Sequence, residues 1–212
     1  MTITIRQIGF EKTVTDTSRH FRSTLTRIGN KLHSKSKDWL IRDNLFIREN
    51  RAVNPYKMAD NERYLRDLDF ILDARMYIVP LEHSEDSVDV IVITKDVFSI
   101  GGSFSPRSAT KTRFKLYDTN LFGWGQRLQF MGHAEEARDP MFGYELIYRK
   151  NSVGGSFITA TGGYTQLNTG SSYGHEDEKA YYIKLDRPLV SPYTRLAGGM
   201  ELSRNSSQNT YN

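Results

Sequence analysis

Apolar and polar side chains alternate in some parts of the chain and recur with a helical period in others. Near the start, TITIRQIGF places Ile3 and Ile5 on one face, with Ile8 and Phe10 following out of step, which predicts a first strand. Residues 13–37 are rich in Ser, Thr, Arg and Lys, with only scattered apolar residues. We interpret this stretch as a long basic connection that is partly helical.

Two helices are predicted after this connection. In KDWLIRDNLFIREN, Ile41 and Leu45 lie four residues apart, as on a moderately amphipathic helix. Asn54 then precedes Pro55, a pair that favours the cap and the first position of a second helix. The apolar spacing predicts that this second helix continues to near Leu72.

Two strands come next. ARMYIVPL and VDVIVITKD are rich in β-branched residues and alternate, and the polar EHSEDS between them is typical of a hairpin loop. The order strand, helix, helix, strand, strand therefore predicts an α+β domain over residues 1–96.

After Asp96 the chain shows no convincing helical period. Seven strand-like runs of mostly about 8 to 12 residues follow, the length of a tilted membrane-spanning β-strand; they are FSIGGSFS, TRFKLYDTN, QRLQFMGH, GYELIYRK, GGSFITATGGYTQL, AYYIKLD and TRLAGGMELS. In TRFKLY, Phe114 and Leu116 alternate with Arg113 and Lys115. An antiparallel all-β segment is predicted over residues 97–212, and alternation alone fits both a membrane barrel and a soluble sandwich.

Composition narrows the classes of function. The net charge is +4, and residues 1–42 carry nine Lys and Arg against three Asp and Glu, so the basic character belongs to this region. This region lacks a recognisable reader motif, so nucleic acid is not an expected partner. The absence of cysteine excludes disulfides, thiol nucleophiles and Cys-ligated zinc. With no apolar helical span and no apolar signal segment at the start, we expect either a cytosolic protein or an internal piece of a longer precursor.

Motifs that could carry catalysis or bind a cofactor have the wrong surroundings. GSSYG at 170–174 matches G-x-S-x-G with Ser172 as nucleophile, but its polar flanks favour a solvated loop, in which we also place the HEDE cluster, 175–178. Gly123 and Gly125 lack the third glycine and the helix of a dinucleotide site. We therefore expect no catalytic site at these motifs and no cofactor or metal.

The first part of the chain resembles a POTRA domain, the periplasmic module of bacterial outer-membrane assembly and translocation proteins. LFIRENRAVNPYKMADNERYLRDLDFILDARMYIVP followed by VDVIVITKDVFSIGGSF matches the last POTRA domain before a barrel. The residues that fit the pattern are Glu62, Arg63, Leu65, Arg66, Asp73 and Ala74.

The second part is similar to the start of the barrel in the BamA-like surface antigen superfamily. NLFGWGQRL matches a strand-turn-strand signature, and DRPLVSPYTRLAGG resembles a later hairpin. Together the two resemblances predict a β-α-α-β-β POTRA-like domain, facing the periplasm, that is followed by the first strands of an outer-membrane β-barrel in a Gram-negative bacterium.

The resemblance implies a non-enzymatic role in assembling outer-membrane proteins or translocating polypeptides. Its partners would be client outer-membrane or secreted polypeptides, assembly lipoproteins and outer-membrane lipid. A POTRA edge strand can bind an incoming chain by β-augmentation. The residues that correspond to this edge are Ala74, Arg75, Met76, Tyr77, Ile78, Val79 and Pro80.

Five further residues are assigned to the barrel by the same resemblance. Gly101 and Gly102 would lie at the lateral seam in the first strand, where glycine should weaken pairing. Gly123, Trp124 and Gly125 would form a tight turn at the periplasmic rim, with Trp124 in the interfacial aromatic belt.

The number of strands and the chain ends lead to one more expectation. The superfamily has a signal peptide, about sixteen strands and a late extracellular motif, whereas this chain offers seven runs, so we expect a fragment of a larger protein. Two alternatives stay open. The parent could export a passenger enzyme such as a lipid hydrolase, or the chain could be a soluble β-rich binding module.

Overall fold

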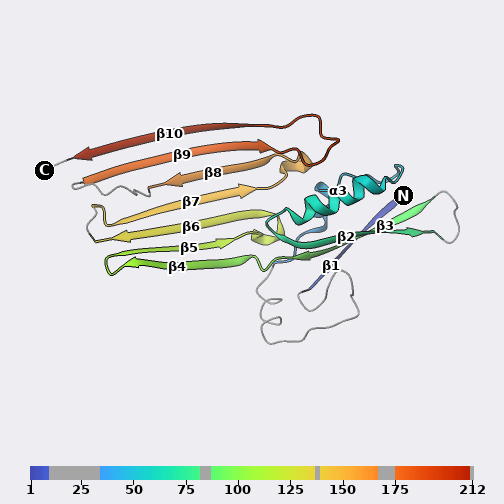
Figure 1. Cartoon of the computed structure of the whole chain (residues 1–212), viewed down its shortest axis with the longest axis horizontal. Helices are drawn as coiled ribbons and strands as arrows, with labels where there is room; N and C mark the ends of the chain where they lie inside the picture. The colour runs from blue at the N-terminus through green and yellow to red at the C-terminus, as the bar shows by residue number, and fades with distance from the viewer. Residues whose placement is uncertain (10–33, 82–86, 137–138, 167–174, 211–212) are drawn as a thin grey trace.

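The strands of the chain form two separate sheets. The computed structural model describes residues 1–9, 34–81, 87–136, 139–166 and 175–210. A three-stranded sheet has the order β1-β3-β2, and a seven-stranded sheet has the order β10-β9-β8-β7-β6-β5-β4. Figure 1 shows the seven strands side by side, with the smaller sheet and its helices beyond one end of them.

The smaller sheet and two helices make up what we call the α+β unit. Its elements are β1 (Thr2–Ile8), α2 (Asp38–Asp43), α3 (Pro55–Arg66), β2 (Ile71–Pro80) and β3 (Val88–Asp96). β1 pairs with β3 in parallel, and β2 pairs with β3 in antiparallel. The predicted order strand, helix, helix, strand, strand is confirmed, while most of the basic connection and the hairpin loop lie outside the described residues.

The first helix is shorter than its pattern predicts, because asparagine side chains replace its hydrogen bonds. It ends before Asn44, whose Nδ2 donates to the Leu40 carbonyl oxygen at 2.8 Å. Asn61 then donates to the Asn44 carbonyl oxygen at 2.9 Å and accepts from the Phe46 N–H at 2.7 Å. These side chains satisfy the backbone groups that a longer helix would have paired.

The second helix begins as predicted and ends early. The Asn54 side chain accepts from the N–H groups two and three residues later at 3.0 and 3.2 Å, which confirms the cap. The prediction that the helix continues to near Leu72 is wrong, since it ends at Arg66. A turn follows, and it delivers Phe70 and Ile71 into the core. Because Phe70 and Ile71 continue the apolar spacing of the helix, the sequence predicted a helix that was too long.

The buried apolar core belongs to the α+β unit. Helices and strands of this unit all contribute to it, and its described members are Ile3, Leu40, Ile41, Leu45, Ile47, Met58, Leu65, Leu68, Phe70, Ile71, Ala74, Met76, Val90 and Val92. No residue of the seven-stranded sheet is among them.

Each of the seven predicted runs corresponds to one strand of the larger sheet, and all neighbours are antiparallel. The strands are β4 (Ile100–Ser108), β5 (Lys111–Asp118), β6 (Gln126–Glu135), β7 (Phe142–Lys150), β8 (Thr159–Thr165), β9 (His175–Arg187) and β10 (Gly198–Thr210). The polarity of residues 175–178 predicted a loop, and this prediction is wrong: these residues form the start of β9 and pair with β10. The GSSYG motif lies outside the described residues.

Three connections at one end of this sheet contact the α+β unit. The β5–β6 connection contains the short 3-10 turn η1 (Leu121–Gly123), and the Gly123 carbonyl oxygen accepts from the Lys37 N–H at 2.9 Å. The β7–β8 connection contains η2 (Val153–Gly155), and beyond it Phe157 packs on Phe46. In the β9–β10 connection, the Tyr193 ring lies 5.3 Å from Lys57 Nζ. These contacts fix the α+β unit at the end of the sheet (Figure 1).

Candidate functional site

The predicted polypeptide-binding residues lie together on one strand at an edge of the smaller sheet. Residues 74–80 all belong to β2, which pairs with β3 and, among the described strands, with no other. The side of β2 that faces away from β3 is therefore available to another strand, unless side chains occupy it.

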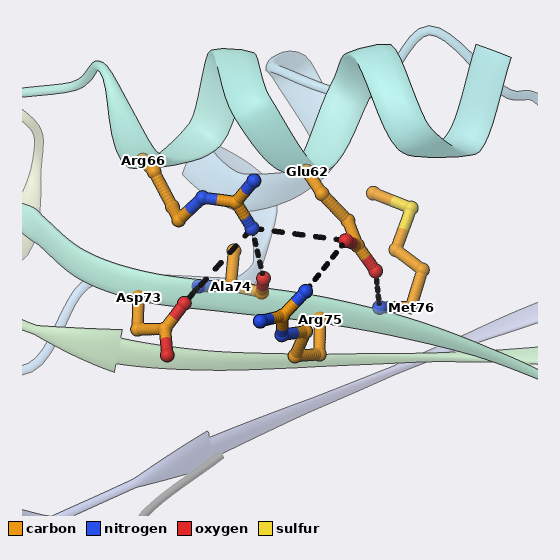
Figure 2. A network of polar contacts seen from close by, with 6 residues as sticks. All are labelled: Glu62, Arg66, Asp73, Ala74, Arg75 and Met76. Atoms are coloured by element: carbon orange, nitrogen blue, oxygen red, sulfur yellow. Dashed lines mark hydrogen bonds and ion pairs between the residues drawn. The ribbon is translucent and has the colours of Figure 1, made fainter. Parts of the chain in front are cut away.

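Side chains of α3 occupy the first half of this edge (Figure 2). The Met76 N–H donates to Glu62 Oε1 at 2.6 Å. Arg66 Nη1 donates to the Ala74 carbonyl oxygen at 3.0 Å. The helix thus satisfies a donor and an acceptor of the edge with charged groups, which form stronger hydrogen bonds than neutral ones.

Ion pairs hold these two side chains in place. Glu62 Oε2 lies 3.4 Å from Arg75 Nη1 and 3.7 Å from Arg66 Nη1. Arg66 also lies 4.0 Å from Asp73 Oδ1. Since the Glu62 side chain is only 16% exposed, its interactions are less screened by water than those of a surface pair.

The second half of the edge presents apolar side chains to solvent. Tyr77, Ile78 and Val79 are each about two-fifths exposed, and so is Leu81 just beyond the strand. Exposed apolar residues on an edge strand are a recognised site of pairing with another chain.

The seven-stranded sheet has one apolar face, and the strand register builds it. One cross-strand row consists of Leu116, Phe130, Leu146, Tyr164 and Tyr181. The neighbouring row consists of Leu128, Tyr148, Gly162, Ile183 and Leu202. Ile183 and Leu202 are more than 60% exposed, so no layer of described residues covers this face there.

The opposite face is polar and carries many cations. One cross-strand row there consists of Arg127, Arg149, Thr161, Lys184 and Glu201. One face apolar and aromatic, the other polar, is the pattern of a membrane barrel wall, in which lipid and an aqueous interior lie on opposite sides.

Gly101 and Gly102, which the resemblance assigns to a seam, lie in the edge strand β4, which pairs with β5 throughout their region. Gly101 is opposite Tyr117, and Gly102 is opposite Leu116. A methyl group on Gly101 would collide with the Tyr117 ring, and one on Gly102 would lie 2.9 Å from the Leu116 side chain. The neighbouring strand therefore fills the space that these glycines leave, which compensates for their missing side chains.

The glycines of NLFGWGQ connect the sheet to the α+β unit as well as β5 to β6. Gly123 and Gly125 have φ values of +75° and +61°, which glycine adopts without strain. A methyl group on Gly123 would collide with the Lys35 carbonyl oxygen, and one on Gly125 would lie 3.0 Å from the Leu40 side chain. Trp124 is partly exposed and packs edge-on against Phe122.

Asn120, which the sequence did not single out, organises this connection. It is fully buried, and its Oδ1 accepts from the Gly125 N–H at 2.8 Å. Its Nδ2 donates to Ser36 Oγ at 2.9 Å and to the Ser34 carbonyl oxygen at 3.4 Å. The side chain thus joins the β5–β6 connection to the segment before α2.

A second polar link joins the α+β unit to the seven-stranded sheet, at the turn after α3. Asp69 Oδ2 accepts from Arg127 at 3.1 Å and from Arg149 at 3.0 Å. A cavity of about 760 Å³ lies beside it, lined by the polar face of the sheet and by α3 residues that include Arg63 and Tyr64. Burial raises the pKa of the Tyr64 phenol, whose hydroxyl donates to Asn44 Oδ1 at 3.0 Å.

The described residues hold neither a metal-binding cluster nor a membrane-spanning helix. They contain no cluster of three or more His, Asp or Glu residues that could hold a metal ion. None of their helices is long and apolar enough to cross a membrane.

Neither a family model nor a curated protein sequence matches the chain. Among solved structures, the chain is similar to the crystal structure of BamA from Haemophilus ducreyi lacking POTRA domains 1-3, with a TM-score of 0.55 and 15% sequence identity. The similarity covers 98% of this chain and 36% of that chain, so this chain spans about a third of its length. The fold is therefore similar to that of BamA, and the seven-stranded sheet is consistent with part of a β-barrel.

Proposed function

We propose that the chain belongs to the BamA-like superfamily and serves in assembling outer-membrane proteins or translocating polypeptides. In this proposal, residues 1–96 are a POTRA-like domain facing the periplasm, and residues 97–212 are the first strands of an outer-membrane barrel. Its partners are client polypeptides, assembly lipoproteins and outer-membrane lipid.

The observation that carries the proposal is the combination of a two-faced sheet with an adjoining edge strand. The apolar rows of the sheet suit lipid, and a soluble β-rich module would expose the same rows to water. The edge strand β2 lies on the α+β unit at one end of this sheet, where a polypeptide could pair with its backbone before reaching the membrane. The similarity to BamA supports the same architecture, since it covers 98% of this chain and therefore includes both the α+β unit and the larger sheet.

Photo-crosslinking in cells tests the proposal. A photoreactive amino acid replaces Tyr77 or Val79 in the full-length protein, and Tyr56 on α3, which is 77% exposed, is the matched control position. We expect Tyr77 and Val79 to capture newly made outer-membrane polypeptides and Tyr56 to capture none. Captured precursors should disappear when synthesis is stopped before irradiation. A lack of captured polypeptide at both edge positions would contradict the proposed role of β2.

A further inference from the structure

The outer side of β2 has a part that α3 closes and a part whose backbone groups no described residue closes, which we call the open part. Successive residues of a strand direct their N–H and C=O groups to alternate sides. Met76 directs its N–H away from β3, because that group meets Glu62 of α3. Ile78 and Pro80, two and four residues further along, therefore direct their backbone groups to the same outer side.

The open part is rich in acceptors and poor in donors. Its acceptors are the carbonyl groups of Met76, Ile78 and Pro80. Pro80 has no N–H, and the Leu81 N–H already donates to the Ser87 carbonyl oxygen at 3.5 Å. With the Met76 N–H held by α3, the Ile78 N–H is the one outward donor between Met76 and Pro80.

We propose that an extended apolar polypeptide segment pairs with β2 over residues 76–80 alone, and that Glu62 stops the added strand from extending toward Ala74. This inference rests on the proposed function and specifies the bound segment and its register. The exposed side chains of Tyr77 and Val79 on one face, and Ile78 on the other, favour an apolar segment.

Glu62 stops the added strand because it is itself an acceptor. A longer strand would bring a carbonyl oxygen to the Met76 N–H, where the Glu62 carboxylate already lies at 2.6 Å. Displacing that carboxylate would leave a largely buried charge without its hydrogen bond. Arg66 closes the neighbouring acceptor in the same way, since it donates to the Ala74 carbonyl oxygen.

Substitution of Ile78 tests the register. The probe is a short fluorescent peptide of alternating Val and Thr, added to the full chain in detergent micelles and followed by anisotropy. Ile78→Pro removes the outward donor and leaves the pairing with β3 intact, because proline is tolerated where the N–H faces away from the sheet. We expect its affinity to be about tenfold weaker than wild type, and Ile78→Val, which keeps the donor, to differ by less than about twofold. Equal affinity of the Ile78→Pro and Ile78→Val variants would overturn the register.

Substitution of Glu62 tests the stop. The same peptide with a photoreactive group at either end is crosslinked, and the modified residues of the chain are mapped by mass spectrometry. We expect crosslinks at 77–80 in the wild type and in Glu62→Gln, whose amide oxygen still accepts from Met76. Additional crosslinks at 74–75 are expected in Glu62→Ala, which frees the Met76 N–H and also removes the ion pair that holds Arg66 at the Ala74 carbonyl oxygen. Circular dichroism spectra identical to wild type show that each variant is folded. Unchanged crosslinks in a folded Glu62→Ala variant would overturn the stop.

The two proposals fail separately. A wild-type chain that binds no peptide overturns this inference, whereas client capture at Tyr77 and Val79 in cells is decided by the separate photo-crosslinking experiment. If clients are captured in cells but the peptide binds the Ile78→Pro and Ile78→Val variants with equal affinity, the proposed function is supported and the proposed register is wrong.

Discussion

Replacing Asn120 with alanine should loosen the contact between the sheet and the α+β unit. The substitution leaves the Gly125 N–H and the Ser36 hydroxyl, both now bonded to the buried Asn120 side chain, without these partners. A buried polar group left unsatisfied costs about 1–3 kcal/mol, so two of them predict a local loss of about 2–6 kcal/mol. Asn120→Asp is the matched control, because it keeps an acceptor for the Gly125 N–H and loses only the donor to Ser36 Oγ and the Ser34 carbonyl oxygen.

Hydrogen exchange followed by mass spectrometry measures this loss where it occurs. A cost of about 2–6 kcal/mol predicts that the Gly125 amide exchanges at least about 30-fold faster in Asn120→Ala. The Lys37 N–H, which donates to the Gly123 carbonyl oxygen, should lose protection with it. Asn120→Asp should show a smaller effect at Gly125. If protection of Gly125 in Asn120→Ala equals that of the wild type, this side chain does not hold the two parts together.

Three further substitutions test other features. Gly123→Ala forces alanine into a left-handed conformation against a backbone carbonyl group, and we expect a loss of more than about 1 kcal/mol in a denaturant titration. Ile183→Lys on the apolar face should destabilise the chain in lipid vesicles by about 2 kcal/mol or more, whereas Thr165→Lys on the polar face, opposite Glu145 and Ala180, should have little effect; equal effects would contradict a lipid-facing surface. Because burial raises the pKa of Tyr64, its neutral phenol stabilises the fold below the pKa of an unfolded tyrosine, about 10, and this contribution is lost as the pH rises through the folded value. Tyr64→Phe should therefore unfold at higher pH than the wild type, while ultraviolet absorbance at alkaline pH should show one late-titrating phenol fewer.

Local signals in the sequence predicted the elements well, whereas contacts between distant residues were invisible to it. Asn54 and Pro55 fixed the start of α3, because a cap depends on neighbouring residues only. The end of α3 was missed, since the apolar residues of the following turn continue the same spacing. Alternation likewise located all seven strands of the larger sheet.

In the candidate site, too, the local structure was predictable from the sequence and the contacts between distant residues were not. Residues 74–80 were placed on one strand by their pattern and by the resemblance, yet nothing in their spacing shows that Glu62, 14 residues before Met76, bonds to that strand. Asn120 beside Gly123 and Gly125 was a weak signal, because asparagine is common in turns and its partner Ser36 lies 84 residues away. Asp69 was likewise one of several acidic residues near the end of a helix.

The location of the core has a consequence for the order of folding. All its described members lie between Ile3 and Val92, so none of these core contacts requires a strand of the larger sheet. The α+β unit can therefore fold first, in water, while the later strands are still unpaired. Lys35 and Ser36 would then already be in place when Asn120 and the β5–β6 connection bind to them, and these contacts would position the first strands of the larger sheet.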